Sequence, residues 1–468
     1  MDVISARTAA MPRVLWIELS SRCPFDCIFC TRASLRGAGE MLDFGLYRRL
    51  IEELERPQII RLNYAGESGH YPQLTEAVAL AAATGAEVEL VSALATLKPG
   101  RLQAALEAGL TRLTVSLHTL DAAEFDAIYR FSSLEAMHQR LQQVLEWRRR
   151  SSRRFMLDLA FVAMQRNLAQ LPAIAAFAAE HGIEVLAVHP LIGRDPLPLG
   201  TAVEHGADGT LHQDFRTRLE STVAEVRSRW PQVAIQLSSH ELTASTSLSA
   251  HPQAWPWPMP DGAVISTCDQ SPFDSVHVLS DGRVIACEVT EKVALGDLRE
   301  HSLREIWHGQ AYRVFRERHR SGAESACRHC VYKSVHRPQP ASVRIEGRQA
   351  PAEQLLGGWH GDDGSGVRWT GAEATLWLPR MARHRQLLLH GMVAPTAGAA
   401  PFSVHLDGRL LHRQTDAGPL QLRLPLPPST QPQRLLQLRR EGATSPHALG
   451  TGADLRELGF ALILAETC

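Results

Sequence analysis

The first part of the chain alternates between two patterns of apolar residues. Between residues 14 and about 191, short apolar or β-branched runs alternate with longer stretches in which apolar residues recur every three or four positions. The short runs predict strands and the longer stretches predict amphipathic helices, as in βαβ units around a parallel sheet. The predicted strands are residues 14–20, 59–66, 87–93, 112–118, 155–164 and 184–191. The predicted helices lie near 43–54, 74–84, 99–108, 133–149 and 168–181.

Glycines that follow several of these helices support the same interpretation. Gly85, Gly109 and Gly182 each come directly after a predicted helix, where a glycine suits the left-handed conformation of a C-cap. Six successive βα units predict an α/β fold, an open, partial (β/α)6 TIM-like barrel that spans residues 12–195.

The pattern changes after the predicted barrel. Residues 196–264 are expected to form a connecting helix (211–229), a strand (233–237) and a linker with a stiff Trp- and Pro-rich run at 255–260. In residues 265–338, which we expect to be a small α+β domain, Asp281-Gly282 predicts a hairpin turn and 303–318 predict a helix. Residues 341–468 show short alternating runs with Gly- and Pro-rich turns, which predict an antiparallel β-sandwich.

Composition and charge exclude some classes of protein. The 468 residues carry 49 Lys and Arg against 50 Asp and Glu, so the net charge of -1 gives no electrostatic basis for binding nucleic acid. Residues 1–11 contain no apolar signal segment and no apolar run is long enough to span a bilayer, so we expect a cytoplasmic protein without a membrane span. Eight cysteines in a reducing compartment indicate metal or redox chemistry, and only Cys468 stands apart from two spaced groups.

The first cysteine group directly follows the first predicted strand. Cys23, Cys27 and Cys30 are separated by three and then two residues, and the aromatic Phe29 precedes the last of them. Thiolates suit zinc, copper(I) and iron–sulfur clusters, and the lack of a fourth nearby cysteine or well-spaced histidine argues against a closed tetrahedral zinc site. Three ligands suggest a four-iron cluster with one open iron. A zinc loop and three buried structural cysteines are the alternatives.

This spacing resembles the cluster-binding loop of the radical S-adenosylmethionine (SAM) enzymes. The resemblance implies that Cys23, Cys27 and Cys30 hold a 4Fe–4S cluster whose open iron is chelated by SAM. In that family an electron from the cluster splits SAM into methionine and a 5'-deoxyadenosyl radical. The resemblance also implies that Phe29 lies against SAM.

Further residues that match the family stand at the ends of predicted strands, where ligands collect in sheets of this kind. Gly66 and Glu67 resemble the family's Gly-Gly-Glu-Pro segment, which holds the SAM amino group, although Ala65 and Ser68 depart from it. A carboxylate that faces an ammonium, on a glycine turn that permits close backbone approach, is physically reasonable. Ser92 stands where many members have Thr-Asn and is a weaker candidate for the ribose or carboxylate.

The later strands supply the remaining candidates. Ser116 and Arg130 resemble the family's Ser-x-Asp strand and the Ile-Arg pattern after it, which implies contacts to the ribose and to the methionine carboxylate. His118 stands where Asp is common and His189 is expected at the same rim, so either is a candidate catalytic base that contacts substrate. Leu191 is a candidate contact for adenine, with ordinary barrel packing as its alternative role.

The second cysteine group consists of Cys268, Cys287, Cys327 and Cys330, with the predicted hairpin and helix between its members. It resembles the C-terminal SPASM extension of radical SAM enzymes in its shortened "twitch" form, because no later cysteine follows except Cys468. The resemblance implies one auxiliary 4Fe–4S cluster, held by all four thiolates and suited to electron transfer. A zinc ribbon is the structural alternative.

The predicted β-sandwich resembles modules appended to glycosyltransferases and methyltransferases of glycan biosynthesis. The resemblance rests on the segments that contain Trp359 and Trp369. An exposed tryptophan there would stack on sugar, although a core position is the commoner one for tryptophan.

These features lead to one main hypothesis and two alternatives. The main hypothesis is a radical SAM enzyme that abstracts hydrogen from a carbohydrate, aminocyclitol or glycan-related substrate and so oxidises, dehydrates or epimerises it. The first alternative is a maturase of a ribosomal peptide, and the second is a non-catalytic metal-binding scaffold. Either enzyme would need a reducing electron donor such as flavodoxin or ferredoxin.

Overall fold

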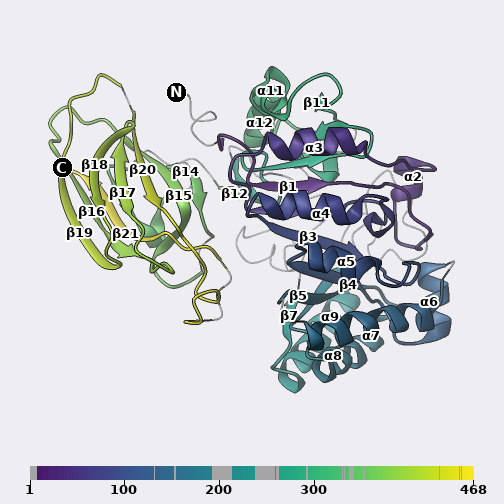
Figure 1. Ribbon diagram of the computed structural model, residues 1–468. Coiled ribbons are helices and arrows are strands. Elements are labelled where there is room, and N and C mark those ends of the chain that lie inside the picture. The colour runs from purple at the N-terminus through teal and green to yellow at the C-terminus, as the bar shows by residue number, and fades with distance from the viewer. Residues whose placement is uncertain are drawn as a thin grey trace. The chain divides into compact units, whose positions relative to one another are not determined.

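The computed structural model of the protein contains two compact units (Figure 1). The larger unit contains Ala10–Met259 and Thr267–Lys333, and the smaller contains Pro260–Ser266 and Ser334–Cys468. The structure describes residues 8–130, 132–151, 154–191, 213–237, 259, 263–290, 293–328, 330, 332–336, 342–351, 354–361, 363–431, 433–452, 454 and 456–468. The predicted Trp- and Pro-rich run lies outside the described residues apart from Met259.

A ten-stranded sheet forms the centre of the larger unit, with the strand order β11-β10-β9-β1-β2-β3-β4-β5-β6-β7. Strands β1 to β7 run parallel, which confirms the predicted α/β partial barrel. The bounds of these strands are Val14–Ile17, Ile59–Arg61, Glu87–Ser92, Arg112–Ser116, Met156–Ala163, Val185–Pro190 and Ala234–Leu237. The α-helices between them, α2 to α9, are Arg32–Arg36, Phe44–Glu52, Leu74–Ala83, Arg101–Ala108, Ala122–Tyr129, Leu134–Arg150, Leu171–Glu180 and Gln213–Arg229. Two 3-10 turns are η1 (Ser68–His70) and η2 (Leu168–Gln170).

The two faces of the parallel sheet differ in polarity. Leu15, Ile60 and Leu113 are fully buried. The alternate side chains, such as those of Trp16 and Arg61, keep part of their exposure. Because successive side chains of a strand point to opposite faces, one face packs into the core with the helices and the other lines the inside of the open barrel.

The helix and the strand expected at 211–229 and 233–237 are present, but they extend the barrel sheet and do not form a separate connecting segment. Helix α9 and strand β7 follow β6 as one further βα unit, and β7 pairs with β6 in parallel. The sheet therefore runs one parallel strand beyond the six that the sequence predicted. Helix α6 was also not predicted, although its N-cap Asp121 accepts a hydrogen bond from Glu124 N–H at 2.8 Å.

The predicted glycine caps are confirmed by backbone conformation. Two helices also have side-chain N-caps. Asp43, the N-cap of α3, accepts a hydrogen bond from Leu46 N–H at its carboxylate. Ser133, the N-cap of α7, accepts one from Ala136 N–H at its hydroxyl oxygen. The glycines after α4, α5 and α8 all have positive φ angles, as the C-cap interpretation requires: Gly85, Gly109 and Gly182.

The hairpin between the second group of cysteines extends the barrel sheet. Strand β9 (Ser275–Val278) pairs in parallel with β1, and β10 (Arg283–Ile285) pairs antiparallel with both β9 and β11 (Gly296–Asp297). The predicted helix at 303–318 is two helices, because the chain is extended at Gly309 between α11 and α12. The helices of this region are α11 (Leu303–His308), α12 (Gln310–Ser321), α13 (Ser325–Arg328) and the 3-10 turn η4 (Glu288–Thr290). A separate two-stranded sheet joins β8 (Val264–Cys268) and β12 (Lys333–His336).

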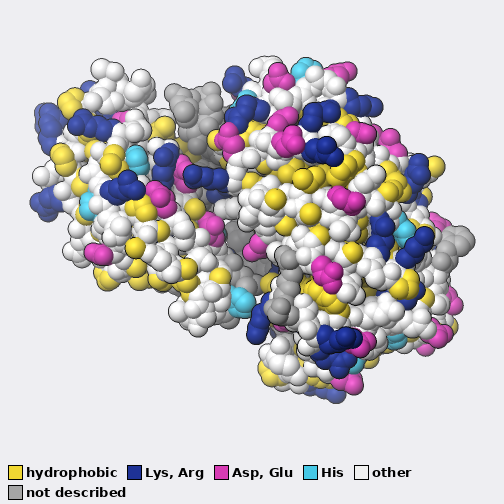
Figure 2. Space-filling view, in the orientation of Figure 1, with side chains coloured by type: hydrophobic (Ala, Val, Ile, Leu, Met, Phe, Trp, Pro, Cys, Tyr) yellow, Lys and Arg dark blue, Asp and Glu magenta, His cyan; other side chains and the backbone are white. Residues whose placement is uncertain are grey.

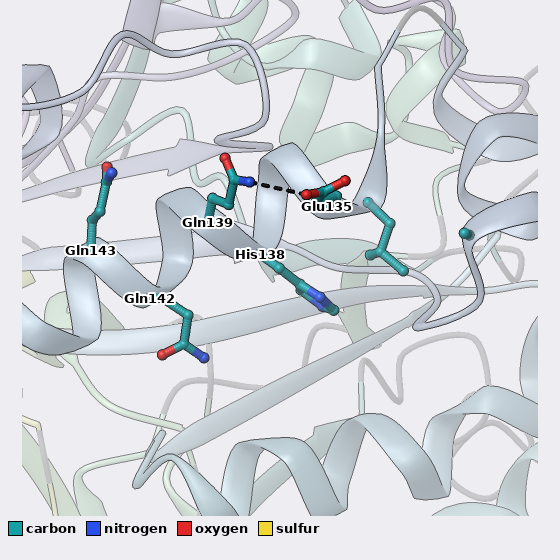
Figure 3. A pocket seen from close by; sticks show the side chains of 7 residues that line it. Glu135, His138, Gln139, Gln142 and Gln143 are labelled. Atoms are coloured by element: carbon teal, nitrogen blue, oxygen red, sulfur yellow. Dashed lines mark hydrogen bonds between the residues drawn. The ribbon is translucent and has the colours of Figure 1, made fainter.

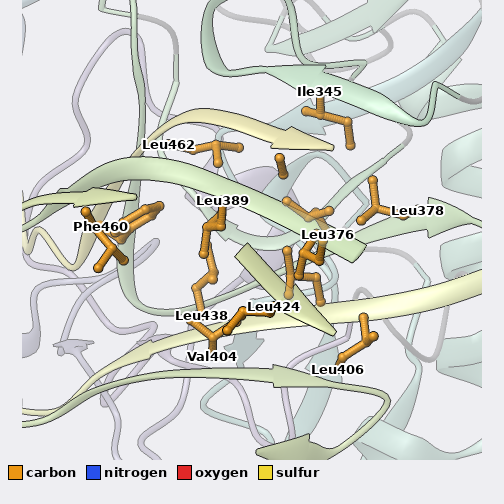
Figure 4. Close-up of a cluster of buried hydrophobic side chains, with 14 of the residues drawn as sticks. Ile345, Leu376, Leu378, Leu389, Val404, Leu406, Leu424, Leu438, Phe460 and Leu462 are labelled. Atoms are coloured by element: carbon orange, nitrogen blue, oxygen red, sulfur yellow. The ribbon is translucent and has the colours of Figure 1, made fainter. Parts of the chain in front are cut away.

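The smaller unit is the predicted antiparallel β-sandwich. Its main strand order is β18-β17-β20-β15-β21-β16-β19, with β13 on β21 and β14 on β15. The bounds of β13 to β21 are Arg344–Glu346, Leu355–Trp359, Arg368–Pro379, Gln386–Val393, Phe402–Leu406, Arg409–Gln414, Gly418–Pro425, Gln433–Arg440 and Phe460–Thr467, with the 3-10 turn η5 at Gly347–Gln349. Alternate residues of these strands form one apolar core that includes Leu389, Val404, Leu438 and Phe460 (Figure 4).

The surface carries charges of both signs. On the face shown in Figure 2, basic and acidic side chains are interspersed over the molecule. Among the residues that the structure describes, no helix has both the length and the apolar character needed to cross a membrane.

Candidate functional site

The first cysteine loop leaves the end of β1 and is held by the end of helix α6. Asp26 N–H donates to Tyr129 O at 3.2 Å, and Ile28 N–H donates to Ile128 O at 3.0 Å. Within the loop, Cys30 N–H donates to Cys27 O at 3.0 Å, which turns the chain between two of the thiols. All three thiols are free. The spacing of the cysteines along the chain thus becomes a compact loop on the C-terminal side of the sheet.

The thiols of this loop lie close enough to influence one another's charge. Burial raises the pKa of Cys23 to about 11. It also raises the pKa of Cys27 well above its usual range, and repulsion from Cys30 and Cys23 adds to the effect. A raised pKa means that ionising these buried thiols costs free energy. A bound metal offsets that cost, because its positive charge stabilises the thiolates. No three His, Cys, Asp or Glu side chains among the described residues are arranged to hold a single metal ion. The all-sulfur donor set fits an iron–sulfur cluster.

Gly66 brings the end of β2 against the start of the cysteine loop. A Cβ atom at this position would lie 2.1 Å from Ser20 O and 2.7 Å from Ser21 Cα. The close backbone approach predicted for Gly66 is therefore an approach to the chain's own backbone between β1 and the cysteine loop. Contact between Gly66 and SAM stays a prediction.

Glu67 joins the ends of β2 and β3. Its side chain is buried, and its two carboxylate oxygens accept hydrogen bonds from Gly69 N–H at 3.1 Å and Ala93 N–H at 3.0 Å. Burial raises the pKa of Glu67, and hydrogen bonds from Ala93, Gly69 and Ser92 oppose the rise. The structure thus brings the candidates Glu67 and Ser92 together. Contacts of Glu67 and Ser92 to SAM, in addition to these hydrogen bonds within the protein, stay a prediction.

An aromatic group lies beside the cysteine loop at the end of β4. The His118 ring stacks on Tyr129 with centroids 5.1 Å apart, and Phe29 meets His118 edge-on at 5.0 Å. Tyr129 O–H donates to Ser116 O at 2.7 Å, which fixes the phenol under the histidine. The candidates Phe29, Ser116 and His118 therefore share one neighbourhood with the loop.

His118 is buried and neutral. Burial, followed by repulsion from His189, lowers the pKa of His118 to about 3. Its Nδ1 accepts a hydrogen bond from Val162 N–H at 3.2 Å, so the ring proton lies on Nε2. His118 would have to give up this bond before it could take a proton at Nδ1. Its predicted role as a catalytic base stays a prediction.

The other candidates stand around this group. Arg130 has a positive φ of 55°, an uncommon conformation for a residue with a side chain, and its guanidinium donates to Asp26 Oδ2 at 3.0 Å. Arg130 thus contacts the cysteine loop itself. Leu191 is buried at the end of β6. His189 is exposed. Nearby protein atoms nevertheless partly desolvate its ring and lower its pKa, and the charge of Glu288 opposes this effect.

The second cysteine group converges in the auxiliary region. Burial raises the pKa of Cys268 well above its ordinary value, and repulsion from Cys287, Cys330 and Cys327 adds to it. The same two causes raise the pKa of Cys327, with burial the larger. Thiols from three separate parts of the sequence, Cys268, Cys287 and the pair Cys327 and Cys330, therefore influence one another's charge, as expected of ligands that share one cluster.

Three side chains that the sequence reasoning missed support these sites. His319 places Nδ1 3.3 Å from Cys327 Sγ. Asn167 is fully buried and its Nδ2 donates to His118 O at 3.0 Å and to Val162 O at 2.9 Å, which ties β4 to β5. Glu18 accepts hydrogen bonds at Oε2 from the N–H and O–H of Ser280, each at 2.9 Å. A charged residue directly after an apolar strand is the one signal in the sequence that could have indicated Glu18.

A pocket on helix α7 is separate from both cysteine groups (Figure 3). Its lining includes Glu135, His138 and Gln142, and Gln139 Nε2 donates to Glu135 Oε1 at 3.2 Å. None of the predicted site residues lines it. It therefore contributes nothing to the assignment of function.

Two family models match the chain over the regions that carry the cysteines. A model described as the radical SAM superfamily matches residues 17–154. A model described as the SPASM iron–sulfur cluster-binding domain matches residues 268–331. Neither match extends into the β-sandwich.

Several known proteins resemble the chain. A PqqA peptide cyclase of Rhodopseudomonas palustris is 27% identical over 37% of this chain and 45% of its own length. A PqqA peptide cyclase of Xanthomonas campestris is 24% identical over 66% of this chain and 77% of its own. A GTP 3',8-cyclase of Chlorobaculum tepidum is 26% identical over 36% and 51%. The chain thus spans about half the length of the first and third of these relatives.

One solved structure supports the fold. The crystal structure of Streptococcus suis SuiB bound to S-adenosylmethionine has a TM-score of 0.51 and 13% identity, over 67% of this chain and 69% of that one. At 13% identity this similarity shows the fold alone.

Proposed function

We propose that this chain, which belongs to the radical SAM superfamily and carries a SPASM iron–sulfur domain, is an enzyme that modifies a peptide. Its superfamily makes SAM and a 4Fe–4S cluster its cofactors, and the SPASM domain adds auxiliary iron–sulfur binding. The observation that carries the peptide assignment is the set of curated relatives named PqqA peptide cyclase, one of which aligns with 66% of this chain.

The expected carbohydrate, aminocyclitol or glycan-related substrate is wrong, because these relatives are peptide cyclases. That expectation rested on the resemblance to twitch enzymes, some of which act in aminocyclitol and aminoglycoside biosynthesis, and on the β-sandwich with its tryptophans. Trp359 packs against the sandwich core, and its indole N–H donates to Thr375 O at 2.7 Å, so the ring is a structural element. The non-catalytic scaffold is wrong as well, because the curated relatives that match the chain together with this superfamily are enzymes.

The residues of the barrel have distinct tasks in this proposal. Cys23, Cys27 and Cys30 hold the cluster, which together with bound SAM supplies a 5'-deoxyadenosyl radical that abstracts hydrogen from the substrate. The ring of Phe29 and the buried ring of His118 form an apolar wall beside the loop that excludes water. Glu67 fixes the ends of two strands and so keeps the walls of the site in register.

The remaining assignments belong to the same proposal. The proposed contacts to SAM are Gly66, Glu67, Ser92, Ser116, Arg130 and Leu191. The side chains proposed to meet the substrate are His118 and His189. A reducing electron donor such as flavodoxin or ferredoxin would supply the electron. The proposed ligands of a single auxiliary 4Fe–4S cluster are Cys268, Cys287, Cys327 and Cys330.

An anaerobic assay tests the function. The reconstituted protein is analysed for iron and sulfide, then given SAM, reductant and a deuterated candidate peptide, and 5'-deoxyadenosine is isolated for mass spectrometry. Deuterium in the 5'-deoxyadenosine supports peptide modification. Deuterium transfer from labelled GTP, with none from any peptide, would overturn the peptide assignment in favour of nucleotide chemistry.

A triple variant serves as the control. Cys23→Ala, Cys27→Ala and Cys30→Ala together should abolish SAM cleavage and keep the iron of the auxiliary site. Retained cleavage in this variant would contradict the assignment of the loop.

A further inference from the structure

His319 lies inside the second group of cysteines. The residue belongs to α12, between the hairpin and the closely spaced pair of cysteines, and only 3% of it is exposed. Its Nδ1 lies 3.3 Å from Cys327 Sγ, and its Nε2 lies 4.0 Å from Cys268 Sγ. One ring therefore contacts sulfurs from both ends of the auxiliary region.

Packing holds the ring in this place. Phe315, one turn earlier in α12, lies nearly parallel to the His319 ring, with centroids 6.4 Å apart. Phe273 approaches it edge-on at 6.1 Å. A buried ring between two aromatic neighbours has few alternative rotamers, so the contact between Nδ1 and Cys327 Sγ is built into the fold.

The chemistry of a cluster decides which atom donates. A cysteine that binds iron is a thiolate and has no hydrogen to give. A ring nitrogen at 3.3 Å from that sulfur is then the donor, so the tautomer with the proton on Nδ1 is required. Phenylalanine would fill the same space, so packing alone does not call for a histidine here.

A second basic group, Lys333, lies beside the same pair of cysteines. Lys333 is buried, and its Nζ donates to Cys330 O at 2.7 Å. Buried donors and positive charge beside cluster sulfurs stabilise the more negative, reduced form of a cluster, which raises its reduction potential.

We propose that His319 is a hydrogen-bond donor to Cys327 Sγ that raises the reduction potential of the auxiliary cluster. His319 is in this view a positioning residue that acts through a ligand and does not bind iron. The proposal concerns the auxiliary site and does not depend on which substrate the enzyme modifies.

The test measures the potential directly. A redox titration, followed by the electron paramagnetic resonance (EPR) signal of the reduced auxiliary cluster, is run in the full chain that carries Cys23→Ala, Cys27→Ala and Cys30→Ala, so that one cluster gives the signal. Adding His319→Phe, which keeps a ring and removes both nitrogens, should leave the iron content intact and shift the potential to more negative values. An unchanged potential with intact iron would overturn the proposal.

Two further variants keep the test decisive if His319→Phe loses iron. His319→Asn places an amide donor near the position of Nδ1, so wild-type iron content and a potential closer to wild type support the donor role. Loss of iron in His319→Asn as well would overturn it in favour of a ligand or a purely structural role. His308→Phe, at an exposed helix end, is the matched control and should leave the potential unchanged.

Discussion

Gly66 shows how a single residue can position the first cysteine loop. The nearest atoms to a Cβ at this position would be Ser20 O at 2.1 Å and Ser21 C at 2.7 Å, and both belong to the backbone. Backbone in a packed strand end cannot move aside as a flexible side chain does. The loop that starts at Ser21 and the carboxylate of Glu67 would therefore both shift if Gly66 gained a side chain.

We expect Gly66→Ala to lower the free energy of unfolding by about 1–3 kcal/mol, the usual cost of forcing extra atoms into a packed site. The variant should also bind less iron at Cys23, Cys27 and Cys30. Urea denaturation and iron analysis of the anaerobically reconstituted protein measure both effects. Gly398→Ala is the control, because a Cβ at Gly398 meets no atom within 4 Å. Equal free energies of unfolding and equal iron contents in the two variants would contradict this explanation.

His277 is a second residue whose environment has a measurable consequence. It lies on β9, is 1% exposed and stacks on Trp16 with centroids 5.2 Å apart. Neither ring nitrogen has a hydrogen-bond partner among the described residues. Burial, with repulsion from Arg61 as the smaller cause, lowers the pKa of His277 to about 3.

The pH dependence of stability follows from this shift. Above pH 6.5 the ring is neutral in both states, whereas between pH 6.5 and about 3 only the unfolded chain binds the proton. Acidification therefore destabilises the fold by about 1.4 kcal/mol per pH unit through this residue. We expect His277→Phe to lose about 2 kcal/mol less stability than wild type between pH 7 and pH 5. Urea denaturation at both pH values measures the difference.

His308→Phe is the control for this experiment, since His308 is exposed. Its stability should fall with acid as the wild type's does. If His277→Phe kept the full acid dependence, the ring would have to be charged in the folded protein.

At the scale of elements, a buried ionic network joins β1, α2 and the hairpin turn. Arg36 Nη2 lies 3.3 Å from Glu18 Oε2, and both side chains are almost fully buried. The same carboxylate oxygen accepts bonds from the N–H and O–H of Ser280, and the Ser280 hydroxyl oxygen also lies 2.8 Å from Ser21 Oγ. Arg36 Nη1 also lies 3.8 Å from Asp281 Oδ2 in the hairpin turn, so two carboxylates hold the helix after the first cysteine loop against that turn.

Glu18→Ala should cost about 3–5 kcal/mol of unfolding free energy, because it leaves the buried Arg36 charge with only the more distant Asp281 carboxylate, at 3.8 Å. Arg36→Met added to Glu18→Ala should recover part of that loss, since it removes the stranded charge. A double-mutant cycle by urea denaturation measures the coupling between the two residues. Additive effects of the two changes would show that the pair does not interact.

The elements of the barrel could be predicted because their signals are local. Each strand from β1 to β6 is a short apolar run, and each predicted helix has its own period and cap. Helix α6 was missed because only eight residues, Ala122–Tyr129, carry its period. Strand β7 was predicted as a strand but placed outside the barrel, because the sequence alone does not show that Ala234–Leu237 pairs with β6.

The candidate site could be predicted only in part, for a related reason. The cysteines and strand-end residues have recognisable spacing, and barrel topology brings strand ends together. Hydrogen bonds between distant residues leave no such signal. Glu67 and Ala93 are 26 positions apart, and Glu18 and Ser280 are 262 apart. The partners of Glu67 and the role of His319 therefore required the structure.

At the scale of the whole molecule, the barrel and the auxiliary region share one sheet. Strand β9 pairs with β1 in parallel over Ser275–Val278, and the Arg13 guanidinium binds the Asp274 carboxylate at 2.6 and 3.1 Å next to that pairing. Both cysteine groups therefore belong to the larger compact unit. The β-sandwich has a separate apolar core and forms a unit of its own.

A shortened protein that ends at His336 tests this division. It keeps all seven grouped cysteines and strands β1 to β12 and lacks the β-sandwich. Because the removed strands bury their apolar residues against one another, we expect the shortened protein to stay folded, to bind as much iron as the full chain, and to form 5'-deoxyadenosine from SAM and reductant at a comparable rate. Iron analysis and chromatography of the nucleoside measure these outcomes. If iron binding or SAM cleavage fell more than a few-fold, the sandwich would have to stabilise the cluster-binding unit, and the two could not be treated as independent domains.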